Sequence, residues 1–232
     1  MRYIETQLKE QPLETPEILC YCPTLRCKDA IVNLWRKKNG EKTYSKPFMG
    51  ATTLTKLSEK LWLIGPGIGS SAACLFTEPF LICGCKNILF FGVCASLDHN
   101  ALQIGDICSP NQFIGSESIA SYYQEISSPP LTASTSPLLK LAQVKQVATW
   151  STDIPNFESP AKSRMMKEKG AIAVEMETAA LFAMTRNYSC NFQAYLVATD
   201  VLEETWLRGF SSKAVEVSIS AVAESIVSRF LV

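Results

Sequence analysis

The stretch AIAVEMETAALF, residues 171–182, indicates the fold class most directly. Its first residues, Ala171 to Val174, form an apolar run of strand length that leads straight into two carboxylates, Glu175 and Glu177. Small helix-forming residues follow at once. A buried strand that passes directly into a helix is the repeating unit of α/β proteins, in which the active site lies at the carboxyl ends of the strands. We therefore expect a ligand site beside this junction.

Other apolar runs, bounded by turn residues, predict the rest of the sheet and the helices that cover it. Strands are predicted near residues 17–22, 51–57, 60–65, 87–92, 104–109, 147–152, 171–175 and 192–199. Helices are predicted over residues 24–38, 68–84, 137–146, 159–169, 177–188 and 211–230. The last helix also alternates with period two, but its length favours a helix. Strands that alternate with helices predict a mostly parallel or mixed sheet.

The composition indicates one α/β domain without a strong net field. A chain of 232 residues with 47% hydrophobic content is sufficient for one large domain, residues 1–232, in which residues 1–16 form an N-terminal extension. Lys plus Arg equals Asp plus Glu at 22 each, so no net charge draws the chain to nucleic acid or to an anionic membrane. The partner that fits this balance is a small molecule.

Three features of the sequence indicate the cellular compartment. The longest apolar runs, such as residues 61–64 and 88–91, are far shorter than the roughly 20 residues that span a bilayer. The N-terminus has early acidic residues and no apolar secretory signal. The cysteines show no CxxC spacing and lie mostly in apolar runs, which predicts reduced core thiols. We expect a cytoplasmic protein.

Residues 61–73, LWLIGPGIGSSAA, form a predicted strand that ends in glycines and continues into small helix-forming residues. Such a turn allows backbone N–H groups to approach an anion or a sugar. It is not a dinucleotide-binding fingerprint, because Ser70 takes the place of the final glycine and no acidic residue ends a strand about 20 residues later. A tight turn with a purely structural role is an equal alternative.

Two further strands end in small or polar residues. They are residues 90–98, FFGVCASLD, and residues 195–200, YLVATD. The acid that ends the second, Asp200, is either a strand cap or a general acid. At the junction described first, Glu175 and Glu177 suit the positive end of a helix dipole, but an ionised carboxylate can also accept hydrogen bonds from both hydroxyls of a ribose diol. The spacing leaves these alternatives open.

In this order and at these separations, the segments resemble the nucleoside phosphorylase and nucleosidase superfamily, specifically its methylthioadenosine/S-adenosylhomocysteine nucleosidase and futalosine hydrolase branch. The resemblance extends from about residue 17 to the C-terminus, and its most specific element is Val174-Glu175-Met176-Glu177 followed by Thr199-Asp200. It implies an α/β fold: a three-layer α/β/α single domain with a central mixed, partly barrel-like sheet flanked by helices. It also implies a homodimer that uses no cofactor and no metal.

The implied activity is hydrolysis of the N-glycosidic bond of an adenine-containing 5′-substituted nucleoside, with release of the free base. The substrate would be methylthioadenosine, S-adenosylhomocysteine, or aminofutalosine or futalosine, the last linking to menaquinone biosynthesis. Asp200 would protonate purine N7 so that the base leaves neutral, and Glu177 would hold the ribose 2′ and 3′ hydroxyls. Met176 would lie beneath the sugar. The other implied substrate-binding residues are Glu175, Val93, Cys94, Ala95, Phe157 and Thr199.

The first predicted helix departs from the nucleosidase pattern. Where nucleosidases have a glutamate that orients the attacking water, residues 22–29 read CPTLRCKD. Cys27 takes the glutamate's place, and the next acid, Asp29, is the candidate to activate water, although two residues along a helix point it elsewhere. Pro23-Thr24 resembles futalosine hydrolases, whereas Ala173–Glu177 resembles the methylthioadenosine enzymes. An enzyme that acts on aminofutalosine would reconcile the two.

Two other functions stay open. The first is a phosphate-dependent purine nucleoside phosphorylase, because Pro23–Arg26 resembles a phosphate-binding turn, although Leu89–Phe91 stand where a second arginine is expected. The second is a catalytically inactive nucleoside-binding relative, since the water-activating glutamate is missing. Metal and serine hydrolases are disfavoured, because the single histidine is His99 and no GxSxG motif occurs.

Overall fold

One mixed sheet lies at the centre of the computed structural model, which describes residues 2–40, 43–114, 119–123, 131–132, 138–139 and 141–231. Every residue of its strands β1 and β4 is buried, as expected of strands covered on both faces. The strands are β1 (Ile18–Tyr21), β2 (Tyr44–Pro47), β3 (Thr53–Lys56), β4 (Leu61–Gly65), β5 (Asn87–Ser96), β6 (Ile107–Ile114), β7 (Leu131–Thr132), β8 (Lys145–Ser151), β9 (Ala173–Glu175), β10 (Asn191–Leu202) and β11 (Trp206–Arg208).

Part of this sheet closes on itself. β5 pairs with both β10 and β9, and the ring is completed by the pairs β10–β6, β6–β8 and β8–β9. These strands form a small barrel, from which β1, β4, β3 and β2 continue outward from β5 in that order. The predicted mixed, partly barrel-like sheet is confirmed.

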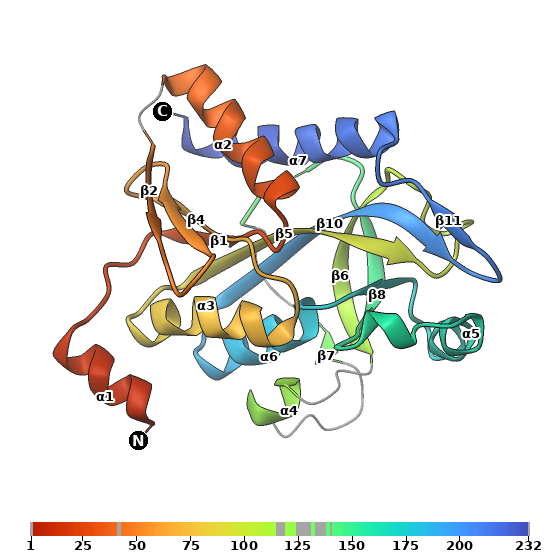
Figure 1. Cartoon of the computed structure of the whole chain (residues 1–232), viewed down its shortest axis with the longest axis horizontal. Helices are drawn as coiled ribbons and strands as arrows, with labels where there is room; N and C mark the ends of the chain where they lie inside the picture. The colour runs from red at the N-terminus through yellow and green to blue at the C-terminus, as the bar shows by residue number, and fades with distance from the viewer. Residues whose placement is uncertain are drawn as a thin grey trace.

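Helices cover both faces of the sheet, as Figure 1 shows. On one face α2 (Leu25–Asn39) packs beside α7 (Lys213–Phe230), and on the other α3 (Ser70–Ile82) packs beside α6 (Thr178–Asn187). The predicted three-layer α/β/α arrangement is therefore confirmed. The remaining helical elements are α1 (Tyr3–Glu10), α4 (Ile119–Tyr123), the 3-10 helix η1 (Pro155–Phe157) and α5 (Pro160–Glu168).

Side-chain caps determine where several helices begin. Thr24, Ser159 and Ser212 each precede a helix and accept a hydrogen bond from the backbone N–H three residues further on. The helix that Ser212 caps, α7, confirms the helical interpretation of the C-terminal segment. Its buried face consists of Val215, Ile219, Val222, Ala223, Ile226 and Val227.

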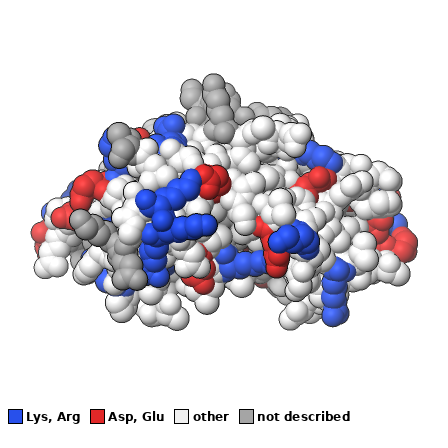
Figure 2. All heavy atoms as spheres, turned by 90° about the horizontal axis from the view of Figure 1, so that it is seen from above, with Lys and Arg blue, Asp and Glu red and all other residues white. Residues whose placement is uncertain are grey.

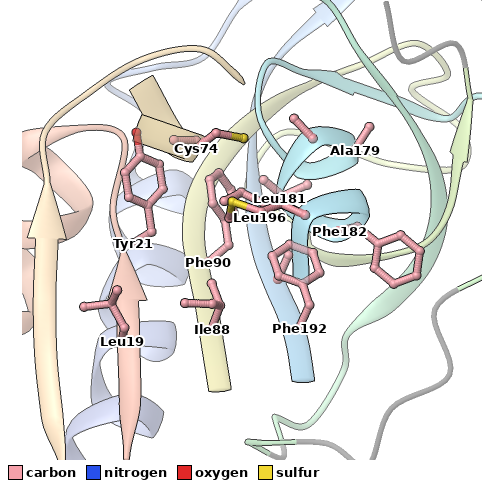
Figure 3. Packing of buried hydrophobic residues seen from close by; sticks show 14 of the residues in the cluster. Leu19, Tyr21, Cys74, Ile88, Phe90, Ala179, Leu181, Phe182, Phe192 and Leu196 are labelled. Carbon is pink, nitrogen blue, oxygen red and sulfur yellow. The ribbon is translucent and has the colours of Figure 1, made fainter. Parts of the chain in front are cut away.

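The central strands divide their side chains between two apolar cores. Alternate residues of a strand point to opposite faces of the sheet. Cys20 of β1 and Leu89 of β5 therefore pack with α2 and α7, whereas their neighbours pack with α3 and α6, as Figure 3 shows. Because helices cover both faces, a ligand can reach the sheet most readily at the strand ends. The labelled residues of the second core are Leu19, Tyr21, Cys74, Ile88, Phe90, Ala179, Leu181, Phe182, Phe192 and Leu196.

The helix predicted over residues 137–146 is wrong. Leu138 and Leu139 lie in a bend, and Lys145 already begins β8, while residues 137 and 140 lie outside the described part. The backbone of Leu139 is bound by side chains of β10: the Gln193 amide accepts from its N–H (2.8 Å) and donates to its carbonyl (3.1 Å), and the Tyr195 hydroxyl donates to the same carbonyl (2.7 Å). Since these polar groups already have partners, no helix is needed to satisfy them.

The charged side chains on the surface and the cysteines are arranged as the composition indicates. Acidic and basic side chains are interspersed on the face that Figure 2 shows, and neither sign covers it. Among the described residues, no helix is both long and apolar enough to cross a membrane. All nine cysteines are free, and all except Cys83 are buried.

Candidate active site

A cavity of about 580 Å³ opens where β5, β9 and β10 meet, beside the start of α6. The register of the barrel explains its position, because Ala95 of β5 is paired with Val174 of β9 on one side and with Asp200 of β10 on the other. The structure thus brings most of the predicted site residues together from three segments of the chain. Those that line the cavity are Val93, Cys94, Ala95, Glu175, Met176, Glu177, Thr199 and Asp200.

Glu175 is bound by the protein on both of its oxygens. Its Oε2 accepts from the backbone N–H groups of Glu177 and Thr178, both at 2.7 Å, and its Oε1 accepts from the Ser151 hydroxyl. The two N–H groups lie at the start of α6, where helix donors lack partners within the helix and the dipole favours negative charge. Burial raises the pKa of Glu175, and these hydrogen bonds oppose the rise. Glu175 therefore fixes the junction of β9 and α6.

Glu177, two residues further on, is 4% exposed and lines the cavity. Its Oε1 accepts from the backbone N–H of Gly69 at 2.5 Å. Gly69 has a φ of 96°, a conformation that side chains disfavour, so the glycine turn is what allows this approach. An oxygen with unused lone pairs beside a cavity is available to a ligand that donates hydrogen bonds.

The surroundings of Glu177 determine its protonation state. Burial, and then the neighbouring Glu175 carboxylate, raise the pKa of Glu177 to about 8. The hydrogen bonds from the N–H groups of Gly69 and Met176 act in the opposite direction. Further donors from a ligand would favour the charged form in the same way.

Asp200 lies on the opposite side of the cavity and is 6% exposed. Its Oδ1 accepts from the Thr199 hydroxyl (2.8 Å) and its Oδ2 accepts from the indole N–H of Trp206 (2.7 Å). Burial raises the pKa of Asp200, and the two hydrogen bonds lower it. A buried carboxyl group with a raised pKa, facing a cavity, is suited to hold a proton and transfer it.

Glu158 and Trp206 are among the lining residues that were not predicted from the sequence. Glu158 directly precedes Ser159, the cap of α5, and burial followed by the Asp200 carboxylate raises the pKa of Glu158 to about 7. Trp206 begins β11, an exposed strand that folds back on the end of β10. Neither residue ends an apolar run, so the pattern of strand ends that identified the other candidates gave no signal for them.

Two predicted residues lie elsewhere. Asp29 is exposed on α2 and lines a separate groove between α2 and α7. Phe157 is 80% exposed in η1 and does not line the cavity. Cys27, which stands at the position of the family glutamate, is buried in the core beneath α2. Where α2 begins, the residues that line the cavity are Pro23 and Thr24.

The charged lining of the cavity is entirely acidic. None of the described lining residues is Lys, Arg or His. Arg26, from the turn that resembles a phosphate site, donates instead to the carbonyl of Phe210 and lines the separate groove. A phosphate dianion would be repelled by the carboxylates and would lose hydration without compensation. Within the described part of the chain, no cluster of three or more His, Cys, Asp or Glu could hold a metal ion. The acidic lining residues are Glu158, Glu175, Glu177, Asp200, Glu203 and Glu204.

A partly closed barrel with an acidic cavity at its strand ends is an arrangement in which α/β proteins typically bind small molecules. The family model of the phosphorylase superfamily matches residues 21–231, and the chain belongs to this family. The superfamily expected from the sequence is thereby confirmed. No curated protein sequence matches the chain.

Solved structures share the fold over nearly the whole chain. The 5′-methylthioadenosine/S-adenosylhomocysteine nucleosidase from Helicobacter pylori, with butyl-thio-DADMe-Immucillin-A, has a TM-score of 0.72 at 18% identity, over 93% of this chain and 98% of that one. The purine nucleoside phosphorylase from Toxoplasma gondii, in complex with immucillin-H, has a TM-score of 0.75 at 13% identity, over 92% and 90%. A futalosine hydrolase mutant of Helicobacter pylori strain 26695 has a TM-score of 0.67 at 17% identity, over 91% and 96%.

Proposed function

We propose that this protein is a nucleosidase, which hydrolyses the N-glycosidic bond of an adenine-containing 5′-substituted nucleoside and releases the free base. Its substrate is methylthioadenosine, S-adenosylhomocysteine, or aminofutalosine or futalosine. One observation carries the proposal: two buried carboxyl groups, Glu177 and Asp200, face a cavity that no described cation lines. The nucleosidase and the futalosine hydrolase among the similar structures support the choice of reaction.

Asp200 is the general acid in this proposal. As the glycosidic bond breaks, positive charge grows on the sugar and negative charge on the base, so a proton delivered to purine N7 lets the base leave neutral. Burial favours the protonated form of Asp200 before the transfer. Afterwards the hydrogen bonds from Thr199 and Trp206 stabilise the carboxylate that remains.

Glu177 binds the sugar. Its Oε1 is fixed by Gly69, and its Oε2 accepts from the ribose 2′ and 3′ hydroxyls. The negative charge of Glu177 also stabilises the oxocarbenium-like ribosyl centre that forms during the reaction. Met176 lies beneath the sugar, and the Ser70 hydroxyl fixes this part of the backbone by donating to the Met176 carbonyl at 2.7 Å.

Water captures the ribosyl centre without help from a carboxylate on α2. The lining residues at the start of that helix are Pro23 and Thr24, and Asp29 faces the other side. We therefore propose that no residue takes the role expected of Asp29: the centre left by the neutral base is electrophilic enough to bond to an unactivated water molecule. The proton that this water releases replaces, through the solvent, the proton that Asp200 gave to the base.

The acidic lining favours hydrolysis over phosphorolysis. Phosphate would require positive charge close to the sugar, and Arg26, the residue that could supply it, is directed to Phe210. The phosphorylase among the similar structures shares the fold, so a direct experiment is needed to distinguish the two reactions.

By the family resemblance, we also propose that the protein acts as a cytoplasmic homodimer. Sedimentation of the purified chain would test the dimer.

The test measures adenine release by the purified protein from methylthioadenosine, S-adenosylhomocysteine and aminofutalosine, each with and without phosphate. Release without phosphate that is lost in Asp200→Asn is the expected result, and it identifies the substrate. Release that requires phosphate would instead establish a phosphorylase. Tight binding of all three nucleosides without release would establish a binding protein.

A further inference from the structure

We infer that Trp206 is a positioning residue that orients and tunes Asp200 through its indole N–H. The inference rests on the proposed function, because it assigns Trp206 a role in the proton transfer by Asp200. Trp206 is paired with Leu202 across a tight hairpin whose turn is residues 203–205. The hairpin returns the indole ring to the cavity, where it forms part of the wall.

The hydrogen bond is short and can have only one direction. The Trp206 Nε1 lies 2.7 Å from Oδ2 of Asp200, and an indole nitrogen donates but never accepts. A proton on Oδ2 must therefore point away from the hairpin. The second oxygen, Oδ1, lies 2.8 Å from the hydroxyl of Thr199, the preceding residue of β10, whose single proton is shared with the Cys94 carbonyl at 3.2 Å. With a donor at each oxygen, the plane of the carboxyl group is fixed and its proton is available to a ligand in the cavity.

The indole is itself held in place. Its ring meets the ring of Phe210 edge-on, with centroids 6.2 Å apart and an interplanar angle of 88°. The Arg208 guanidinium lies 4.0 Å from the centre of the indole ring, a cation–π contact. Trp206 is nevertheless 51% exposed. A half-exposed tryptophan contributes little to the core, so its contacts point to a role at the cavity.

The direction of the effect on Asp200 follows from the charge. A hydrogen bond from a neutral donor stabilises the carboxylate more than the carboxylic acid, so loss of the Trp206 N–H raises the pKa of Asp200. A general acid works only while it is protonated, and kcat/KM therefore falls as the pH rises through its pKa. Loss of the N–H shifts this alkaline fall to higher pH. The other titratable or charged groups around Asp200 are Cys94, Glu158, Glu175, Glu177, Glu203, Glu204 and Arg208.

The kinetic test uses Trp206→Phe, which keeps an aromatic ring and removes the donor. We expect kcat to fall about 10- to 100-fold, the effect of one hydrogen bond to a charged group, and the alkaline fall of kcat/KM to move to higher pH. Trp206→Gln returns an N–H donor and moves the profile back toward the wild type. The matched control, Leu207→Ala, changes an exposed neighbour on β11 that does not line the cavity, and it leaves the alkaline fall in place. An unchanged pH profile in Trp206→Phe overturns the inference, because a merely structural residue would lower the rate without moving it.

A second measurement does not depend on activity. In protein labelled with ¹⁵N at the indole nitrogens, the Trp206 resonance is identified by its loss in Trp206→Phe. We expect this resonance to shift with pH in the wild type and to become independent of pH in Asp200→Asn. A wild-type resonance that does not titrate overturns the inference even if the enzyme is active. A titrating resonance in a protein that releases no base contradicts the proposed function instead, and with it the catalytic meaning of the hydrogen bond.

Discussion

The two sides of the cavity bind their carboxyl groups by different means. At the junction of β9 and α6, Glu175 and Glu177 accept mainly from backbone N–H groups, at the start of the helix and at Gly69, and the Ser151 hydroxyl is a side-chain donor to Glu175. At the end of β10, Asp200 accepts from two side chains, Thr199 and Trp206. Backbone donors are placed by the fold itself, whereas side-chain donors can be exchanged one at a time. In the proposed function, the junction would supply the surface that binds the sugar, and the end of β10 would supply an acid whose pKa depends on its side-chain donors.

The largest effect is expected on the reactive side. Asp200→Asn removes the acidic proton but keeps acceptors for Thr199 and Trp206, so the fold should persist while kcat falls about 10²- to 10⁴-fold, the usual contribution of a general acid. Rates of base release, with thermal unfolding as the control for folding, measure this. Full activity in a folded Asp200→Asn protein would show that another residue is the general acid. The difference proposed between the two sides of the cavity would then not hold.

On the binding side, Glu177→Gln should reduce kcat/KM by about 10- to 100-fold, because the neutral amide loses a charge-assisted interaction with the sugar. A substrate that lacks the 3′ hydroxyl tests the contact between Glu177 and the sugar directly. In the wild type, kcat/KM should be much higher for the full substrate than for the one that lacks this hydroxyl. In Glu177→Gln, the difference in kcat/KM should be much smaller. Equal discrimination by both proteins would show that Glu177 does not touch the diol.

Within the junction itself, Glu175 and Glu177 should differ in their effect on stability. Glu175→Ala leaves two buried backbone N–H groups and the Ser151 hydroxyl without their acceptor, and we expect the free energy of unfolding to fall by about 2–4 kcal/mol. Glu177→Ala removes the partner of one N–H group and should cost less. Urea unfolding of the two variants tests this order, and the reverse order would contradict the role of Glu175 in fixing the junction of β9 and α6.

The pH dependence of stability should report the raised pKa of Glu177. In the unfolded chain this group ionises near its usual value of 4.5, whereas in the fold its pKa is about 8. The stability it contributes is therefore fully present below about pH 4.5 and is lost as the pH rises through about 8. Calorimetry should show a Tm that declines over this range, and a shallower decline in Glu177→Gln. Identical slopes would contradict the burial of an ionisable group at this position.

The smallest effect is expected outside the cavity. Asp29→Asn should leave kcat/KM within about twofold of the wild type and stability within about 0.5 kcal/mol, as for an ordinary surface substitution. The assay of base release already described measures the first and urea unfolding the second. A loss comparable to that in Asp200→Asn would restore Asp29 as the residue that activates water.

Much of the fold could be predicted because its interior strands have strong local patterns. Continuous apolar runs such as Leu61–Ile64 indicate strands covered on both faces, and the α7 spacing indicates a helix. The exposed elements α1, β2 and β11 have no buried residue and hence no apolar period to detect. The false helix over residues 137–146 arose because the Gln193 and Tyr195 side chains, distant in sequence, satisfy the Leu139 backbone.

The same distinction applies to the site. Glu177 and Asp200 follow buried strands and could be identified as candidates, and both line the cavity. The Gly69 turn was also predicted, but its contact with Glu177 joins residues from separate segments. Trp206 reaches Asp200 only because a hairpin folds back on β10, and hairpin geometry is not encoded in an apolar pattern. Contacts made by tertiary structure, rather than residue types, were therefore what the sequence could not reveal.

The most direct test of the account is the fate of the sugar when the reaction runs in ¹⁸O-labelled water that also contains phosphate. Hydrolysis yields free adenine and a free sugar that carries the label at its C1 hydroxyl, since water is the nucleophile and no described cation recruits phosphate to the cavity. An unlabelled sugar 1-phosphate as the product would contradict it, because it would show that the acidic cavity admits a phosphate dianion.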